Sequence, residues 1–467
     1  MRIIGLLLAS LQSASSAKDG LALTPPRGWR DWNQWQGDID MTIMMSTIDA
    51  MTDTSRGGVS LASVGYSDVG LDDAWQMCGI YSEYNYTYHQ ADGTPVVNTT
   101  KFPSLSTMTA YGHAHNLTMG FYGNNCRCKD HISDAISFAA EANFVIDNGF
   151  DSVKLDGCGA QENIELWYNI VSSQARMTAR SRNTRLTQFL PPTRTAQYNW
   201  TRSSGKRAGK GILIENCHNG PHSGSPASVS PFGPHVPTAD WCPFHYYRSS
   251  TDIAPVFGSI LSNLETIPPL AAANLSTPGC WAYPDMLEVG VLNTQSLGVP
   301  PLNYNEARSH FGAWSITSSP LILGLDVTNA TTLDTFWNII TNTEAIAVNQ
   351  DYAGFSGSRF FASDDVTLFQ PCGWWAKNCS FPTIQYWYKP MSNGDVAVLL
   401  LNAGDQSADL TLEFHNVPGL EMPQGSQAKV RDIWNHADLG TYDGAFTAGG
   451  VTTRDSVFLR LSPVSSR

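Results

Sequence analysis

Acidic residues stand where several short apolar segments of this chain end. Lys154 lies two residues before one of these acids, Asp156, and Arg248 lies four residues before another, Asp252. If the apolar segments are parallel strands of one sheet, their carboxyl ends meet, and the side chains that follow them share one pocket. The acids in question are Asp72, Asp73, Asp156, Asp252 and Asp285. The pattern predicts an acidic pocket edged by aromatic side chains.

Two carboxyl groups in one pocket are suited to the cleavage of glycosidic bonds. One carboxylate attacks or stabilises the anomeric carbon, and a second, protonated carboxyl donates its proton to the leaving oxygen. A separation of about 5–5.5 Å between them gives retention of configuration. A neighbouring Lys or Arg keeps the nucleophile ionised, and desolvation keeps the acid protonated near neutral pH.

The segments that precede these acids alternate with helix-like stretches over the first three-quarters of the chain. The strand-like segments include 64–71, 119–122, 153–155, 212–214 and 320–323, and the helix-like stretches include 134–148 and 304–316. Short buried strands that alternate with helices predict parallel βα units. About 300 residues of such units suit an α/β fold, the (β/α)8 TIM barrel, with its chemistry at the carboxyl ends of the strands. A doubly wound sheet is less favoured, because no G-x-G-x-x-G turn follows the first strand.

The hydrophobic period changes to two after about residue 345. Segments 395–401, 410–414 and 456–461 are strand-like, and Asn393-Gly394 is a hairpin turn signal. The sequence therefore predicts a catalytic barrel over residues 18–340, followed by a C-terminal antiparallel β-sandwich domain over residues 345–467.

Composition and charge limit the classes of binding partner that the chain is expected to have. The net charge of −13 argues against nucleic acid or an anionic membrane as the main partner. Residues 176–210 contain nine Lys or Arg and no acid, which we interpret as a solvated loop inserted in the barrel; a docking patch for an acidic partner is the alternative. The sequence leaves a homodimer open.

The amino terminus predicts export. Residues 1–17 combine Arg2, a short apolar run and the small-residue end Ser15–Ala17, which is typical of a signal peptide. No later run reaches about 18 apolar residues, so no membrane span is predicted. Nine cysteines and seven N-x-S/T sequons fit a disulfide-bonded glycoprotein that is secreted or delivered to a lysosome or vacuole. Cys126 and Cys128 lack a second Cys or His pair at zinc spacing, so a disulfide is favoured over a metal site.

Six blocks of the chain resemble, in order, the motifs of glycoside hydrolase family 27, the α-galactosidase or melibiase family. The family motifs are TPPMGWNSW, GYxxVxIDDCW, KYDNC, R-x-x-x-D-I, PGGWNDPDML and VNQD. The matching blocks are Thr24–Trp32, Gly65–Trp75, Lys154–Cys158, Arg248–Ile253, Pro278–Leu287 and Ala347–Asp351. They span nearly the whole chain after the predicted signal peptide, which is more specific than any single motif.

The resemblance implies a retaining glycosidase that releases α-D-galactosyl residues from galactosides or related glycans without a cofactor or metal. Asp156 takes the position of the nucleophile and Asp252 that of the acid/base. The implied sugar-binding residues are Asp72 and Asp73 for the 4- and 6-hydroxyls, Lys154, His218 and Arg248 for the 2- and 3-hydroxyl side, Trp32 and Tyr122 as walls, and Asp285 near the leaving group. Core packing for the two aromatic residues, and a capping role for Asp285, are the alternatives.

The chain departs from the family pattern at several positions. Ala74 replaces a cysteine, and its usual partner falls at Gly37, which is consistent with the loss of one disulfide. Tyr283 replaces an acid, and His218 replaces the Glu of the C-E-W block that touches the 2-position. We therefore expect weaker selection at the 2-position, unless His218 points away and caps a loop.

The remaining cysteines are expected to form disulfides, with one thiol left over. Cys158 is expected to pair with Cys128 or Cys126, with the other reaching Cys78. The further expected pairs are Cys217–Cys242 and Cys372–Cys379, which leave Cys280 as the free thiol.

Other functions remain as alternatives. A lectin-like or catalytically weak homologue is expected to lack one of the two catalytic aspartates, and both are present. A serine hydrolase is disfavoured, because there is no G-x-S-x-G elbow. Within the family, a β-L-arabinopyranosidase and an α-N-acetylgalactosaminidase are the rivals; the Asp72-Asp73 pair, suited to a 6-hydroxyl, favours galactose.

Overall fold

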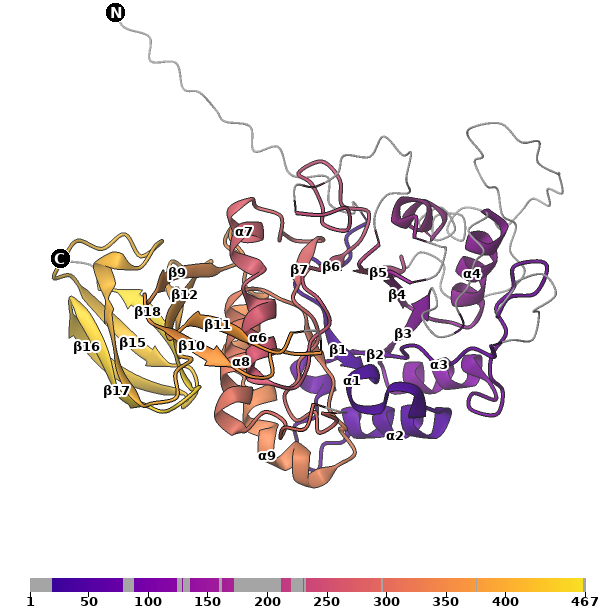
Figure 1. The fold of residues 1–467 in the computed structure, drawn as a ribbon, viewed down its shortest axis with the longest axis horizontal. Helices are drawn as coiled ribbons and strands as arrows, with labels where there is room; N and C mark the ends of the chain where they lie inside the picture. Colours follow the sequence, from indigo (N-terminus) through magenta and orange to yellow (C-terminus); the bar gives the residue numbers. More distant parts are fainter. Residues whose placement is uncertain are drawn as a thin grey trace, which may run out of the picture.

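The computed structural model describes residues 19–78, 88–123, 128, 135–158, 162–171, 211–219, 230, 232–294, 297–374 and 376–464. The predicted signal peptide and the basic stretch 176–210 lie outside the described residues. Figure 1 shows two bodies side by side: a barrel coloured from indigo to orange, and a yellow domain of antiparallel strands that ends the chain.

The barrel consists of eight parallel strands in the order β7-β6-β5-β4-β3-β2-β1-β8. A parallel bridge between Leu287 and Leu323 joins the two ends of this sheet, so the ring closes. The strands are β1 Arg27–Arg30, β2 Asp68–Gly70, β3 Thr118–Gly123, β4 Ser152–Asp156, β5 Leu213–Cys217, β6 Tyr246–Arg248, β7 Trp281–Tyr283 and β8 Leu321–Leu323. The α/β barrel expected from the alternating pattern is thereby confirmed.

Helices cover the outside of the barrel. Helix α8 begins at a capping box, in which the Asn303 side chain accepts from the Glu306 backbone N–H and Glu306 reciprocates. Helices α4 and α8 fall within the predicted helical stretches. The helices are α1 Trp32–Trp35, α2 Met41–Thr52, α3 Leu105–Ala114, α4 Ala135–Asp147, α6 Phe257–Leu264, α7 Ile267–Ala272, α8 Tyr304–Ile316, α9 Ala330–Ile340 and α10 Thr343–Gln350, with 3-10 turns η1 Gln36–Asp38, η2 Ala62–Val64 and η4 Phe414–Asn416.

The C-terminal domain is built on a six-stranded antiparallel sheet in the order β16-β15-β18-β13-β12-β9, with the pair β14-β17 beside it. The predicted turn at Asn393-Gly394 joins β12 and β13, and Gly394 has the positive φ of 88° that such a turn favours. The strands are β9 Ser358–Ala362, β10 Val366–Phe369, β11 Cys379–Pro382, β12 Ile384–Pro390, β13 Val396–Asn402, β14 Ala408–Glu413, β15 Gln427–Asp432, β16 Ala437–Asp443, β17 Ala445–Val451 and β18 Ser456–Pro463.

Strand β13 links the cores of the two domains. Successive side chains of a strand point to opposite faces. Val398 and Leu400 belong to the core of the β-domain, whereas Ala397 and Leu399 belong to the large core that continues into the barrel. A side chain in place of Gly312 on α8 would meet Leu399, so the helix packs closely on this strand. The apolar run therefore has no solvent face, which explains its composition.

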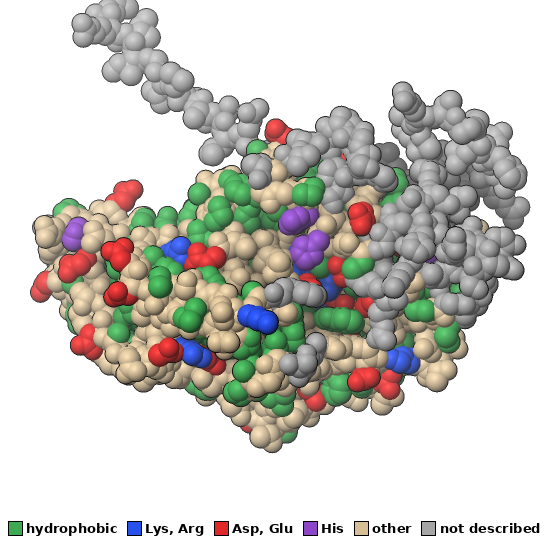
Figure 2. Space-filling model, in the orientation of Figure 1, with side chains coloured by type: hydrophobic (Ala, Val, Ile, Leu, Met, Phe, Trp, Pro, Cys, Tyr) green, Lys and Arg blue, Asp and Glu red, His purple; other side chains and the backbone are tan. Residues whose placement is uncertain are grey.

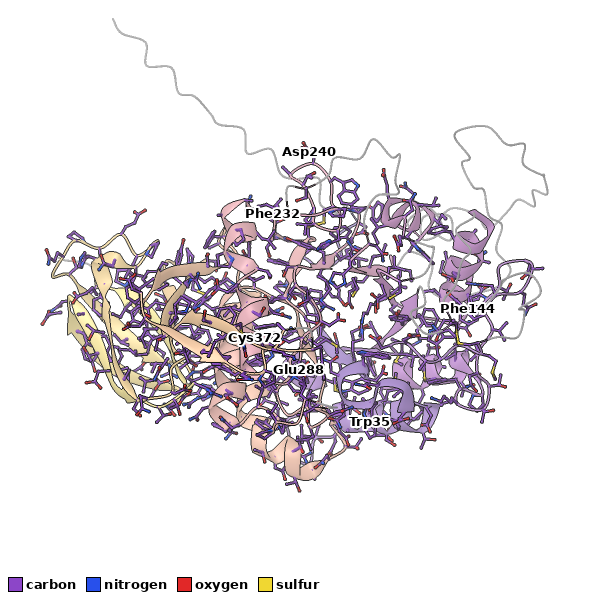
Figure 3. The ribbon with its side chains drawn as sticks, viewed as in Figure 1. Trp35, Phe144, Phe232, Asp240, Glu288 and Cys372 are labelled. Carbon is purple, nitrogen blue, oxygen red and sulfur yellow. A yellow bond between two sulfur atoms is a disulfide. The ribbon has the colours of Figure 1, made fainter. Side chains whose placement is uncertain are left out.

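A loop of the C-terminal domain also reaches the barrel beside α6. The disulfide Cys372–Cys379, expected from the sequence, closes this loop, and Figure 3 places Cys372 between the two domains. Trp374 in the same loop donates its indole N–H to the backbone oxygen of Ile253, at 2.7 Å. The second domain therefore holds the segment that carries Asp252.

Within the described part of the chain, no helix is both long and apolar enough to cross a membrane. Acidic side chains are spread over the visible face of the C-terminal domain (Figure 2), in line with the net charge of −13.

Candidate active site

The carboxyl ends of the barrel strands carry the predicted site residues. Asp156 is the last residue of β4, and it lies in register with Cys217, the last residue of β5. Arg248 ends β6. Asp72 and Asp285 each follow their strand, β2 or β7, by two residues. The barrel thus brings to one end acids that are far apart in the sequence.

Asp156 is held through both of its carboxylate oxygens. The Tyr122 hydroxyl donates to Oδ2 at 2.9 Å, and the Gly157 backbone N–H donates to Oδ1 at 2.7 Å. Tyr122 is buried, and burial together with the charge of Asp156 raises the pKa of its phenol well above the usual value. The phenol therefore stays protonated and acts as a fixed donor.

Lys154 and Asp72 form a buried ion pair beside the nucleophile position. Lys154 Nζ lies 2.7 Å from Asp72 Oδ2. Burial alone lowers the pKa of Lys154, but the negative charge of Asp72 outweighs it and holds that pKa well above its usual value. Asp72 Oδ1 accepts from the Asp73 backbone N–H at 2.9 Å, and the Asp72 N–H in turn donates to Asp31 at 2.6 Å. Both oxygens of Asp72 thus have protein partners.

Asp73 is different, because one of its oxygens is open. Oδ1 accepts from the Ala74 N–H at 2.8 Å, whereas Oδ2 is buried without a hydrogen-bond partner among the described residues. Burial, with a contribution from Asp72, raises the pKa of Asp73 to about 6. An unpartnered buried acceptor is costly unless a ligand satisfies it, so Asp73 is suited to accept a sugar hydroxyl.

Arg248 ties two acids together on the other side of the pocket. Its Nη2 lies 2.6 Å from Asp285 Oδ2 and 3.1 Å from Asp252 Oδ1. The Asp252 side chain is 58% exposed. Partial burial of this region raises the pKa of Asp252, but the charges of Arg248 and Lys154 outweigh it and lower that pKa below its usual value. The expectation that desolvation keeps the acid protonated is therefore wrong for the sugar-free protein, because Arg248 stabilises the carboxylate.

Asp285 braces the segment that carries Asp252. Its Oδ2 accepts from the Ile253 N–H at 2.9 Å, and its Oδ1 accepts from the Met286 N–H at 2.8 Å. Ile253, the neighbour of Asp252, is therefore held on both sides: its N–H donates to Asp285, and its carbonyl accepts from Trp374. The predicted placement of Asp285 near the leaving group stays a prediction, and these contacts give it a positioning role.

His218 lies next to the nucleophile position. Its Nε2 is 2.8 Å from the backbone oxygen of Ser250. A carbonyl only accepts, so Nε2 carries the proton and Nδ1 presents a lone pair. Burial and the nearby charge of Arg248 lower the pKa of His218, which favours the neutral ring. His218 thus uses its one donor within the protein, and its remaining acceptor, Nδ1, lies 3.7 Å from the Cys217 thiol.

Trp32 and Tyr283 belong to one cluster of apolar side chains. Trp32 is half-buried and packs against a cluster of buried residues that includes Tyr246 and Tyr283. The Tyr283 hydroxyl is buried without a hydrogen-bond partner in the described ranges. The role of Trp32 as a pocket wall remains a prediction.

The disulfides agree in part with expectation. Cys128 bonds Cys78, as in the expected arrangement that leaves Cys126 for Cys158, and the alternative pair Cys128–Cys158 is wrong. Cys158 is also disulfide-bonded, and Cys126, its other expected partner, lies outside the described residues.

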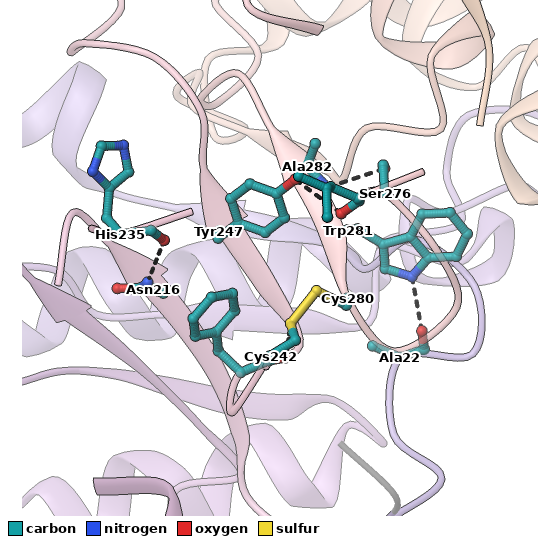
Figure 4. Close-up of a disulfide and its surroundings, with 11 residues drawn as sticks. Ala22, Asn216, His235, Cys242, Tyr247, Ser276, Cys280, Trp281 and Ala282 are labelled. Carbon is teal, nitrogen blue, oxygen red and sulfur yellow. Dashed lines mark hydrogen bonds between the residues drawn. A yellow bond between two sulfur atoms is a disulfide. The ribbon is translucent and has the colours of Figure 1, made fainter. Parts of the chain in front are cut away.

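Cys242 bonds Cys280, so the Cys217–Cys242 pair and the free Cys280 are also wrong. Figure 4 shows this bridge at the amino ends of β6 and β7, where Cys280 directly precedes Trp281. Cys217 is the last residue of β5, at the carboxyl end of the strand, whereas this bridge precedes β6 and β7. It is buried, and it is the free cysteine of the described residues.

The sequence interpretation missed a buried charge network below the pocket. Arg30 Nη1 lies 2.6 Å from Asp68 and its Nε 3.9 Å from Glu215, and the Tyr246 hydroxyl donates to Glu215 at 2.7 Å. Glu215 directly follows the strand-like segment 212–214, and the sequence pattern gave it no role. The signal that could have found the network is Arg30, a charged residue that directly follows Trp29 and ends β1.

One group of described residues has the geometry to hold a metal ion. Ligand atoms of Asp156, Cys217 and His218 all lie within 4.8 Å of one another. The Cys217 sulfur is 3.7 Å from His218 Nδ1.

Comparison with known proteins places these observations in a family. Residues 24–201 match the family profile described as alpha galactosidase A, and residues 382–461 match the alpha galactosidase C-terminal beta sandwich domain. The chain is 27% identical over 438 residues to an alpha-galactosidase of Cyamopsis tetragonoloba, an alignment that covers 92% of this chain and 85% of that protein.

Solved structures share the fold. Alpha-galactosidase I from Mortierella vinacea superposes with a TM-score of 0.68 at 23% identity, covering 96% of this chain and 100% of that one. A GH27 β-L-arabinopyranosidase from Geobacillus stearothermophilus gives 0.69 at 16% identity, covering 97% of this chain and 100% of that one.

Proposed function

Because this chain belongs to glycoside hydrolase family 27, the α-galactosidase family, we propose that it hydrolyses terminal α-D-galactosyl residues with retention of configuration. The observation that carries the proposal is Asp156, aimed by Tyr122 and Gly157 at the end of β4, with Asp252 across the pocket on the segment fixed by Arg248. One carboxylate is immobilised and the other is accessible, as a nucleophile and an acid/base require.

The first step forms a glycosyl-enzyme. Asp156 attacks the anomeric carbon, the bond to the leaving oxygen breaks, and Asp252 gives its proton to that oxygen. Asp252 is ionised in the sugar-free protein at neutral pH, and Arg248 lowers its pKa below the ordinary value of an aspartate. A bound sugar covers its exposed side and withdraws water, which raises the pKa toward the working range.

The second step releases the sugar. Asp252, now a carboxylate, takes a proton from a water molecule, and the resulting hydroxyl attacks the anomeric carbon and frees Asp156. Arg248 stabilises Asp252 in this basic form, since the two groups are 3.1 Å apart. The Arg248–Asp252 ion pair thus favours the second step, in which Asp252 acts as a base, and disfavours the first step, in which Asp252 must be protonated.

The open oxygen of Asp73 supports galactose as the sugar. Galactose carries a 6-hydroxyl that arabinopyranose lacks, and Asp73 Oδ2 is a buried acceptor that needs such a donor. The other predicted contacts are Asp72 for the 4- and 6-hydroxyl side, Lys154, His218 and Arg248 for the 2- and 3-hydroxyl side, and Trp32 and Tyr122 as walls.

β-L-Arabinopyranosidase activity is the second candidate. His218 offers only an acceptor at the 2-position, since its N–H is used on Ser250. One such bond selects less strongly than the charged Glu of the family pattern, so we propose measurable activity on both sugars, with galactosides preferred.

Entry into the secretory pathway completes the proposal. The three described disulfides fit an oxidising compartment, and the predicted signal peptide 1–17 supplies the route to secretion or to a lysosome or vacuole. The barrel over 18–340 and the β-domain over 345–467 are proposed as the two units, although helix α10 crosses the latter boundary.

Hydrolysis of a panel of nitrophenyl glycosides tests the function. We expect the highest kcat/KM on the α-D-galactoside, a lower value on the β-L-arabinopyranoside, and the α-anomer of galactose as the first product by proton NMR. A first product of inverted configuration, or a preference for α-N-acetylgalactosaminide, contradicts the proposal.

A further inference from the structure

The end of β5 carries a thiol that the glycosidase mechanism does not use. Cys217 is buried, free and in register with Asp156 on the neighbouring strand, and the next residue is His218. We propose that Asp156, Cys217 and His218 form a Zn²⁺ site at the floor of the active-site pocket, and that the bound ion inhibits hydrolysis. Zinc binding rests on this geometry alone; the inhibition rests on the proposed function.

The distances suit zinc. Zinc is bound tetrahedrally, with Zn–S of about 2.3 Å and Zn–N of about 2.0–2.1 Å, which sets the sulfur and nitrogen about 3.6 Å apart. Cys217 Sγ and His218 Nδ1 are 3.7 Å apart. The Asp156 oxygen lies within 4.8 Å of both atoms, so a shift of about 1 Å completes three ligands.

The hydrogen bonds around the ligand side chains also favour zinc binding. Zinc-bound imidazoles usually donate their other ring N–H to a backbone carbonyl or a carboxylate, which fixes the tautomer. His218 does this already, through Nε2 and the Ser250 oxygen at 2.8 Å. Tyr122 and Gly157 orient the carboxylate of Asp156 in the same manner. The His218 ring and the Asp156 carboxylate are therefore oriented before any ion arrives.

The charge balance permits a dication. Binding converts the Cys217 thiol to a thiolate and releases one proton, so the thiolate and Asp156 together neutralise Zn²⁺. Arg248 donates to Cys217 Sγ at 3.5 Å and is paired with Asp285 at 2.6 Å, and Lys154 is paired with Asp72 at 2.7 Å. Occupation of Asp156 by the ion removes the nucleophile, so zinc and sugar compete.

Cobalt substitution tests the site without any activity measurement. Metal-free protein, prepared with EDTA and dialysed, is titrated with Co²⁺ and then with Zn²⁺. We expect one equivalent of Co²⁺ to give the near-ultraviolet charge-transfer absorption of a cobalt–thiolate bond, and Zn²⁺ to abolish it. Absence of this absorption in the folded wild-type protein overturns the proposal.

Two variants locate the site. Cys217→Ser is expected to lose the absorption and to weaken zinc binding at least about tenfold, with Cys217→Ala as a substitute if the first variant does not fold. His235→Ala is the matched control, because His235 packs edge-on against His218 at 5.5 Å but supplies none of the three ligands. It should keep the absorption. Equal zinc affinity in the wild type and Cys217→Ser would refute the site.

Inhibition is then measured separately. We expect Zn²⁺ to raise KM for the nitrophenyl α-galactoside, with reversal by EDTA and a shift of at least about tenfold in the inhibitory concentration for Cys217→Ser. Cobalt and zinc binding without inhibition would leave the site standing and count against Asp156 as the nucleophile, so the two failures are distinguishable.

Discussion

Asp73→Asn is expected to make the folded protein more stable at neutral pH while weakening sugar binding. The wild-type carboxyl is buried and its pKa is raised from 3.8 to about 6. A difference of about 2 pKa units corresponds to about 3 kcal/mol of extra free energy for the ionised form in the folded protein. The amide of the variant carries no charge and does not incur this cost.

The sign follows from proton binding. Between the unfolded value near 3.8 and the folded value of about 6, the folded state binds more protons than the unfolded state. The contribution of Asp73 is therefore fully present below about pH 4 and is lost as pH rises through about 6. The stability advantage of Asp73→Asn should grow by about 3 kcal/mol between these limits and stay constant above them.

Urea unfolding of both proteins at about pH 4 and about pH 7.5 measures this difference. Asp72→Asn is the matched control, because it also neutralises a buried acid but leaves Lys154 without its partner at 2.7 Å. That variant should lose stability at neutral pH. A stability difference between Asp73→Asn and the wild type that does not change with pH would refute the reasoning, as would a gain in stability from Asp72→Asn.

Three further predictions concern the acid/base segment and the 2-position. Trp374→Phe removes the 2.7 Å hydrogen bond to the Ile253 oxygen and should lower kcat about tenfold on unactivated galactosides. The control is Trp434→Phe, because the indole N–H of Trp434 has no hydrogen-bond partner in the described chain. Equal losses of kcat in the two variants would contradict a positioning role for Trp374. Arg248 lowers the pKa of Asp252, so the fraction of protonated Asp252 should rise as pH falls from 7 to 4. The ratio of kcat/KM for an unactivated galactoside to kcat/KM for a nitrophenyl galactoside should therefore increase over this range. Asp252→Ala should remove this pH dependence, and a wild-type ratio that does not change with pH would exclude Asp252 as the acid. His218→Ala should change the ratio of kcat/KM for α-galactoside and β-L-arabinopyranoside, whereas an unchanged ratio would assign His218 a structural role only.

The barrel was predictable because its signal is local. Each buried strand is a short apolar run, and the acid that follows Leu155 or Leu71 lies at a strand end in any parallel arrangement. Helix α8 was predictable for the same reason, since its start is set by its own cap, Asn303 with Glu306. The gathering of Asp72, Asp156 and Asp252 at one end follows from topology once the strands are assigned.

The missed features depend on three-dimensional distances. The sequence does not give the height of a cysteine along the barrel, so the pairing of Cys242 with Cys280 instead of Cys217 was not foreseen. The lowered pKa of Asp252 depends on a 3.1 Å contact with Arg248, which spacing alone does not supply. Arg30 and Glu215 belong to residue types that are mostly exposed, and only the closed barrel buries them together.

The most direct test of the account is to trap the sugar on the enzyme. A fluorinated galactosyl fluoride that forms the glycosyl-enzyme quickly and releases it slowly is reacted with the protein, and the labelled peptide is sequenced by mass spectrometry. We expect one sugar per chain, in ester linkage to Asp156, and no label in Asp156→Asn. A label on a different carboxylate, or turnover of the wild-type level in Asp156→Asn, would contradict it.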